Sequence, residues 1–221
     1  MRLPPLAPRD REEYLLGHCR GKAVLHLGCA DWPLTRARLR DGSLLHAKLA
    51  AVTDRLWGID ASADGIRLMT DAGFPNLVAL GRTDELAPTL RRTFDRVVAG
   101  EILEHLDDPG SFLAGLRGVC HPGTLLLLTV PNFASLKRLP RLLWGEETVH
   151  PDHRAYYSVV TVTRLCAEQG FRRREVFSYW GTRGRFAFLL NPVCRRLPFL
   201  QALADGLCFA FSPDVAPEPG R

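Results

Sequence analysis

Short apolar runs alternate with helix-like segments along the first 130 residues of the chain. The runs cover residues 23–27, 56–60, 76–80, 96–99 and 124–129. The last of them contains four consecutive leucines, so both of its faces are apolar, which is typical of a parallel strand covered on both sides. The alternation predicts an α/β fold with a parallel sheet between two helical layers.

Capping residues and glycines set the expected helix boundaries. The spacing predicts helices over residues 9–19, 43–52, 62–72, 111–119 and 161–169. Ser43 and Ser62 are the predicted N-caps of two of these helices, and Gly73 ends the second of the two. Two further strands are expected near the end of the chain, over residues 174–178 and 206–211.

The length of 221 residues suits one α/β domain, which we expect to span residues 1–212. Within it, residues 131–160 and 180–205 are expected to be insertions that cover the substrate side, and residues 213–221 a C-terminal tail. A hydrophobic fraction of 46% and a charged fraction of 24% are ordinary for a globular protein.

The first residues lack the apolar core of a secretory signal, so a cytoplasmic location is predicted. The net charge of +5 is not gathered in any block of basic residues, which favours a solvated surface and predicts no nucleic-acid partner. Residues 185–205 combine apolar side chains with Arg195 and Arg196, a pattern compatible with weak contact to a membrane surface or a lipid-linked substrate, although core packing is the commoner explanation.

Two residues at strand ends are candidates for ligand binding. Gly28 follows the first apolar run, and Asp60 ends the second. Ligands of open α/β sheets bind at the carboxyl ends of the strands, where a carboxylate can accept hydrogen bonds from ribose hydroxyls. The alternative is that Asp60 only caps the following helix, a role that Ser62 can also fill.

Four segments resemble successive signatures of class I S-adenosylmethionine-dependent methyltransferases. They are residues 24–30, 57–60, 94–106 and 121–126. The resemblance covers roughly residues 12–180 and is strongest to the small-molecule branch that includes ubiquinone-biosynthesis-type and sugar-modifying O-methyltransferases. It implies a Rossmann-like, mostly parallel seven-stranded sheet of order 3-2-1-4-5-7-6, with strand 7 antiparallel and helices on both faces.

The same resemblance implies S-adenosylmethionine as cofactor and assigns its contacts to the ends of four strands. The implied contacts are His26, Gly28, Cys29, Ala30, Asp60, Ala61, Arg82, Thr83, Ala99, Gly100 and Glu101. The chain departs from the usual family pattern at four positions. His26 and Arg82 stand where acidic residues are common, and Ala30 and Trp32 replace glycines.

Methyl transfer from a sulfonium is an in-line displacement that mainly requires alignment of the two reacting centres. For a hydroxyl acceptor, a histidine could remove the proton. His153 is slightly favoured over His105 for this role, with Tyr157 as a positioning hydroxyl. His150, Asp152 and His153 lie close in sequence, but with no ordered set of further ligands and only scattered cysteines, no metal is expected.

The sequence therefore predicts an enzyme that methylates a hydroxyl of a small molecule, such as a sugar, glycolipid or secondary metabolite. A nucleic-acid or protein methyltransferase is less favoured, because residues 99–102 lack the Asn/Asp-Pro-Pro-Tyr sequence. A nucleoside-binding or partner-binding protein without catalysis stays open, given the four departures. A nicotinamide dehydrogenase is disfavoured because the turn lacks Gly-x-Gly-x-x-Gly.

Overall fold

The computed structural model describes residues 4, 6–138, 142–147, 149–181 and 198–214. Its centre is a seven-stranded sheet of order β3-β2-β1-β4-β5-β7-β6, in which β7 pairs antiparallel with β5 and β6 and the other neighbouring strands pair in parallel. The strands are β1 (Val24–Leu27), β2 (Leu56–Asp60), β3 (Leu77–Ala79), β4 (Phe94–Gly100), β5 (Cys120–Pro131), β6 (Phe171–Tyr179) and β7 (Gly206–Pro213). The predicted strand order and the antiparallel seventh strand are confirmed.

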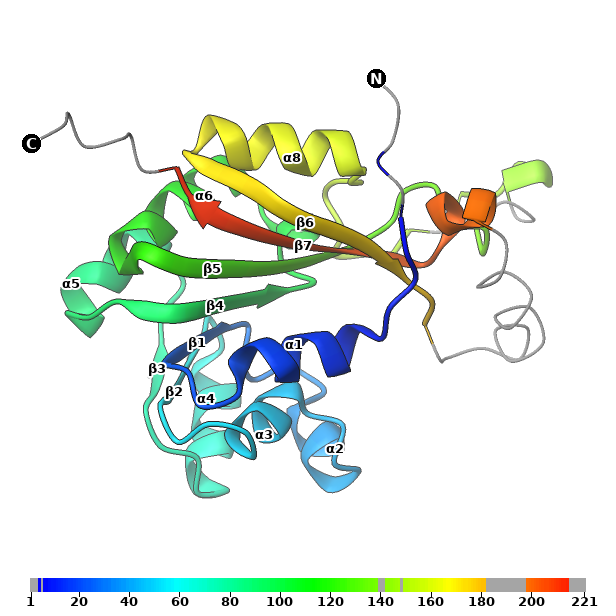
Figure 1. Ribbon diagram of the computed structural model, residues 1–221. Coiled ribbons are helices and arrows are strands. Elements are labelled where there is room, and N and C mark those ends of the chain that lie inside the picture. The colour runs from blue at the N-terminus through cyan, green and yellow to red at the C-terminus, as the bar shows by residue number, and fades with distance from the viewer. Residues whose placement is uncertain (1–3, 5, 139–141, 148, 182–197, 215–221) are drawn as a thin grey trace, which may run out of the picture.

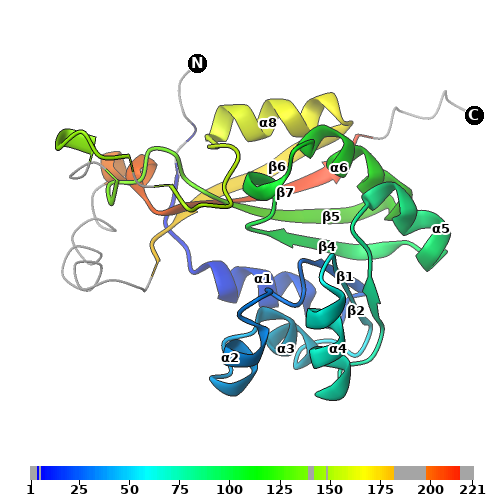
Figure 2. The ribbon, with the colours of Figure 1, turned by 180° about the vertical axis from the view of Figure 1, so that it is seen from behind.

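Helices cover both faces of the sheet. The α-helices are α1 (Arg11–Cys19), α2 (Thr35–Arg40), α3 (Leu45–Ala50), α4 (Ala63–Asp71), α5 (Leu86–Leu90), α6 (Pro109–Leu116) and α8 (Val159–Glu168). The short 3₁₀ turns are η1 (Thr83–Glu85), η2 (Leu103–His105), η3 (Arg117–Val119) and η4 (Pro198–Leu203). Figure 1 shows α1, in blue, across one face, and the view from behind in Figure 2 shows α6 and α8 on the other.

The leucine run in β5 explains why the sheet is covered on both sides. Leu126 and Leu128 pack in the core cluster formed with α5, α6 and α8, whereas Leu127 packs in a second cluster with α1 and α3. All three leucines are fully buried. Since alternate side chains of a strand point to opposite faces, a continuous apolar run is what a central strand of a three-layer fold requires.

One of the two predicted helix caps is confirmed and the other is wrong. The hydroxyl of Ser62 accepts a 3.0 Å hydrogen bond from the Gly65 amide and caps α4. Helix α3 instead begins at Leu45, with Leu44 at its N-cap and no side-chain hydrogen bond there. The backbone amide of Ser43 donates to the Arg38 carbonyl at the end of α2, so Ser43 belongs to the preceding turn.

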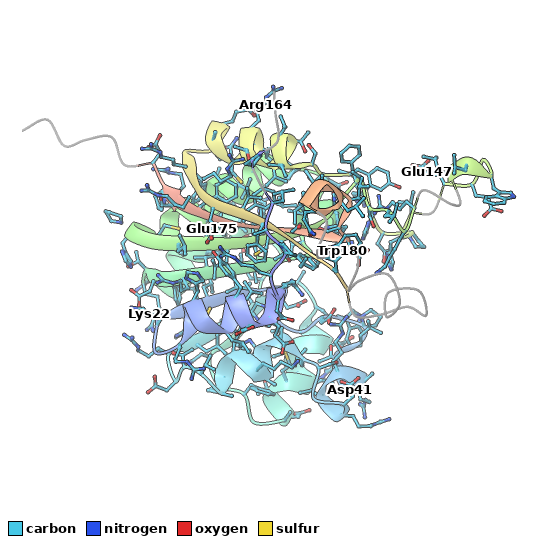
Figure 3. All side chains as sticks on the ribbon, turned by 45° about the vertical axis from the view of Figure 1, so that its right-hand side comes forward. Lys22, Asp41, Glu147, Arg164, Glu175 and Trp180 are labelled. Carbon is cyan, nitrogen blue, oxygen red and sulfur yellow. The ribbon has the colours of Figure 1, made fainter. Side chains whose placement is uncertain are left out.

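The carboxyl ends of the parallel strands meet at one edge of the sheet, on the right in Figure 1. The segment that follows β5, the turn η4 and the residues before α1 gather at this edge. Figure 3 shows Trp180 beside η4 and Glu147 on a segment that projects beyond it. The Asn132 amide donates to the Asp205 carbonyl and the Phe133 amide to the Tyr157 carbonyl, at 2.9 and 3.0 Å, so main-chain bonds tie these segments together.

Some expectations fall outside the described residues. Residues 185–197 of the expected membrane or lipid contact and residues 215–221 of the expected tail are among them. In the part of the chain that is described, no helix has both the length and the apolar character needed to cross a membrane.

Candidate functional site

Gly28 turns the chain at the carboxyl end of β1. Its φ of +64° lies in the left-handed region, which residues other than glycine rarely adopt. A Cβ at this position would lie 3.2 Å from Cδ1 of Ile102, which follows β4. The backbone conformation therefore favours glycine, a Cβ would press on Ile102, and the turn presents bare backbone at the edge of the sheet.

Asp60 joins the end of β2 to this turn. Its Oδ2 accepts a hydrogen bond from the Ala30 amide and its Oδ1 accepts one from the Ser62 amide, both at 2.9 Å. Because each carboxylate oxygen has two lone pairs, both oxygens retain capacity to accept a ligand hydroxyl. Ser62 rather than Asp60 caps α4, so the capping interpretation does not account for this carboxylate.

The side chains of Cys29 and Ala30 point into the protein. Both residues are fully buried. A Cβ on Gly58 would meet Cys29 Sγ at 2.8 Å, and one on Gly65 would meet the Ala30 methyl at 2.7 Å. Neither side chain is open to solvent at this edge, and Gly65 gives the room that the alanine needs. Ala61 is exposed at the same edge.

The ring of His26 is buried and packs against another histidine. Its Nδ1 lies 3.2 Å from Nδ1 of His46 on α3, and both rings are buried. Burial, with the neighbouring His46 and Arg11, lowers the pKa of His26 well below its usual value, and burial lowers the pKa of His46 to about 4. The ring of His26 therefore belongs to a buried histidine pair, a contact that the sequence did not predict.

The turn after β3 borders an open groove. Arg82 is exposed and forms a 2.6 Å ion pair with Asp84, while the Thr83 hydroxyl donates to the Phe112 carbonyl at 2.9 Å. The groove has a volume of about 630 Å³ and lies between this turn and the start of α6. Its lining includes Gly81, Thr83, Leu106, Ser111 and Phe112.

At the end of β4 the chain packs around a partly buried charged group that the sequence analysis did not identify. Arg11, the first residue of α1, donates from Nε to Thr129 Oγ1 at 3.1 Å. Its guanidinium passes so close to Gly100 that a Cβ there would lie 2.5 Å from Nη2. Ala99 beside it is fully buried. A larger residue at position 100 would therefore displace the Arg11 guanidinium.

Glu101 follows Gly100 with a φ of +55°. Its Oε1 accepts a 2.7 Å hydrogen bond from the Tyr179 hydroxyl at the end of β6. Burial first, and then the charge of Glu101, raise the pKa of Tyr179 well above its usual value, so the phenol remains a donor. Tyr179 lies about 80 residues away in sequence, and no pattern in the sequence relates it to Glu101.

Glu104 is a second acidic residue near Glu101, and the sequence analysis did not identify it. It is 1% exposed, and neither of its carboxylate oxygens has a hydrogen-bond partner among the described residues. Burial, and then the charge of Glu101, raise its pKa above the ordinary value. The signal that could have identified Glu104 is its position directly before His105, in the turn that follows a strand.

The two histidines proposed as bases lie next to each other. The ring centroids of His105 and His153 are 4.8 Å apart, and His150 lies 5.1 Å from His153. Burial and the neighbouring His105 lower the pKa of His153. Tyr157 is buried and its hydroxyl donates to the Leu103 carbonyl at 3.2 Å, so it supports the η2 turn that carries Glu104 and His105.

Comparisons with known proteins concern the family and the fold of the chain. A family model described as a methyltransferase domain matches residues 6–176. No curated protein sequence matches the chain.

Solved structures of similar fold include an S-adenosylmethionine-dependent methyltransferase from Archaeoglobus fulgidus, at 17% identity and a TM-score of 0.57 over 92% of this chain and 94% of that one. The N-methyltransferase NodS from Bradyrhizobium japonicum is 18% identical, with a TM-score of 0.54 over 93% and 95% of the two chains. A Burkholderia thailandensis 1,6-didemethyltoxoflavin N1-methyltransferase is 15% identical, with a TM-score of 0.51 over 94% and 78%. At these identities the likeness concerns the fold.

Proposed function

Because the chain belongs to the methyltransferase-domain family, we propose that it transfers a methyl group from S-adenosylmethionine to a hydroxyl of a small molecule. The observation that carries the proposal is the Asp60 carboxylate, which is bonded to the Gly28 turn and retains free lone pairs at the edge of the sheet. A sugar, a glycolipid or a secondary metabolite is the expected acceptor.

The residues at this edge fit the parts of the cofactor. Asp60 would accept the ribose hydroxyls, and the backbone of Gly28 would pass along the methionine part. The groove between Thr83 and Phe112 would take the adenine, with Arg82 held aside by Asp84. Glu101 and Gly100, at the end of the neighbouring strand, would lie beside the sulfonium. S-adenosylmethionine would supply the methyl group.

The acceptor would enter beside η2 and the residues that precede α8. This is where Glu104, His105 and His153 come together. We propose that these side chains hold the acceptor oxygen in line with the methyl group, since alignment is the main contribution that the displacement requires. Tyr157 would act on the acceptor only indirectly, by fixing the Leu103 carbonyl.

Calorimetry with S-adenosylmethionine, S-adenosylhomocysteine and NAD tests the cofactor assignment. We expect saturable binding of both sulfur compounds and none of NAD. Absence of binding to either sulfur compound would remove the proposal.

Transfer of a radiolabelled methyl group tests the acceptor class. Matched acceptors that carry either a hydroxyl or an amine on the same sugar or aromatic ring separate O- from N-methylation, a distinction that matters because two of the similar structures are named N-methyltransferases. Label in the hydroxyl acceptors is expected. Label in the amine acceptors alone would show N-methylation in place of O-methylation. Cofactor binding without transfer to any acceptor would favour a binding protein without catalysis.

A further inference from the structure

Glu104, His105 and His153 form a cluster of ligand-type atoms. One atom from each side chain can be chosen so that all three lie within 4.8 Å of one another. Glu104 and His105 come from the η2 turn after β4, and His153 comes from the segment before α8. The cluster therefore unites two parts of the chain that lie about 50 residues apart.

The state of Glu104 is unusual for a buried carboxylate. Its two oxygens are enclosed, and neither accepts a hydrogen bond from any described residue. A buried acid without a partner carries a desolvation cost that a bound cation removes.

His105 is oriented as a metal-binding histidine is. Its Nδ1 lies 3.2 Å from the carbonyl oxygen of Asp152, and since a carbonyl can only accept, Nδ1 carries the proton. The lone pair is then on Nε2. A backbone carbonyl that fixes the tautomer of the ring in this way is the usual outer partner of a metal-bound histidine.

Main-chain hydrogen bonds bring His153 to the other two residues. The Arg154 amide donates to the Glu104 carbonyl at 2.7 Å, and the His153 amide donates to the His150 carbonyl at 2.9 Å. The Tyr157 hydroxyl bonds to the Leu103 carbonyl from the same segment. The cluster is thus held by the backbone on both sides and does not depend on a chance approach of long side chains.

From this arrangement we infer that Glu104, His105 and His153 form a binding site for Zn²⁺. Two imidazoles and one carboxylate are a known zinc donor set, with an open fourth position for water or an acceptor oxygen. Calcium and magnesium prefer sites built from more oxygen ligands. Bonds of about 2.0–2.2 Å place the ligands of a tetrahedral zinc about 3.5 Å apart, so the side chains would draw in by about 1 Å on binding.

The site changes the role of His153. As a ligand it has no free lone pair with which to act as a general base, and its part would be to hold the ion. The inference does not depend on the acceptor being a hydroxyl, because binding of zinc alone can be measured in the absence of cofactor and acceptor.

The test is a zinc titration of the full chain after chelator treatment, with Co²⁺ absorption as a second readout of the ligand set. We expect one ion per chain. Glu104→Gln and His153→Asn should each lower the affinity for zinc at least 100-fold. His121→Asn is the matched control, since His121 lies 3.3 Å from Asp95 in a different part of the structure and should leave zinc affinity unchanged.

Each outcome bears on the site. Absence of zinc binding by the wild-type chain, or equal affinity of the wild type and both site variants, would overturn it. Urea unfolding of the metal-free proteins checks that the variants are folded, and His105→Asn supplies a third site variant if Glu104→Gln is not. Zinc binding without methyl transfer would count against the proposed function alone, whereas methyl transfer unaffected by chelators, in a chain that binds no zinc, would count against the site alone.

Discussion

The Tyr179 hydroxyl donates a 2.7 Å hydrogen bond to Oε1 of Glu101, and this bond joins the end of β6 to the end of β4 across the intervening strands. The Tyr179 ring fills the space above Gly206, where any larger residue would collide with it. Glu101 is thereby fixed in its left-handed backbone conformation at the edge of the sheet.

Tyr179→Phe should lower the free energy of unfolding by about 1–3 kcal/mol, because the Glu101 carboxylate loses a donor in a partly buried position. Tyr14→Phe is the control, since it removes an equally short bond, also 2.7 Å, to Glu175, which keeps a second donor in Arg9. Urea unfolding should show a larger loss for Tyr179→Phe. Equal losses would contradict the structural role of the Glu101 bond.

Asp60→Asn should lower the affinity for S-adenosylhomocysteine about 10- to 100-fold, because hydrogen bonds to a charged acceptor contribute about 1.5–3 kcal/mol. The amide can still accept from Ala30 or Ser62 but supplies fewer lone pairs to a ribose. Asp64→Asn, on the exposed face of α4, should leave calorimetric affinity unchanged. Equal affinity of both variants would argue against Asp60 as a ribose ligand.

Gly28→Ala should destabilise the protein by more than the 1–2 kcal/mol that is about the cost of a left-handed backbone for a residue with a Cβ. The excess would come from the contact with Ile102 at 3.2 Å. Gly21→Ala separates the two causes, because Gly21 has the same φ of +64° and no atom near its Cβ position. Unfolding midpoints that fall equally in both variants would show that Ile102 moves aside at no cost.

The buried histidine pair predicts acid sensitivity. His46 has a pKa of about 4 when folded and an ordinary value of 6.5 when unfolded, so between these values the unfolded chain binds more protons. The free energy of unfolding should therefore be fully present above pH 6.5 and fall by about 3 kcal/mol as the pH is lowered to 4. Urea unfolding at several pH values measures this slope.

His46→Phe should make that slope shallower, with buried His26 still contributing to it. His150→Asn, which changes an exposed histidine, should leave the slope as in the wild type. A wild-type slope that persists in His46→Phe would assign the acid sensitivity to other groups.

The sheet could be predicted because each strand is indicated by a pattern within a short segment of the sequence. The apolar run in β5 and the single residues Gly28 and Asp60 lie within short segments whose pattern indicates their structure directly. Helix α2 was not predicted, since Thr35–Arg40 alternates arginines with small or apolar residues and lacks a helical apolar stripe. Ser43 was misassigned because that helix displaced it into a turn.

The site was only partly predictable, because its polar partners are distant in sequence. The resemblance implies Glu101, and a polar segment between the fifth strand and the next helix predicts His153. The Tyr179 hydroxyl that donates to Glu101 and the Glu104 carboxylate near His153 depend on the packing of β6 and η2, which no local pattern indicates. His46 was likewise not identified. The resemblance implies a cofactor contact for His26, and the structure adds a buried partner for its ring, His46 on α3.

The bond from the Arg154 amide to the Glu104 carbonyl involves no side chain. Any residue except proline at position 154 can make it. The segment before α8 can therefore change most of its side chains during evolution while it still approaches η2 in the same register. A family built on this connection can exchange the residues that face the acceptor, and with them its choice of acceptor, without rebuilding the edge of the sheet.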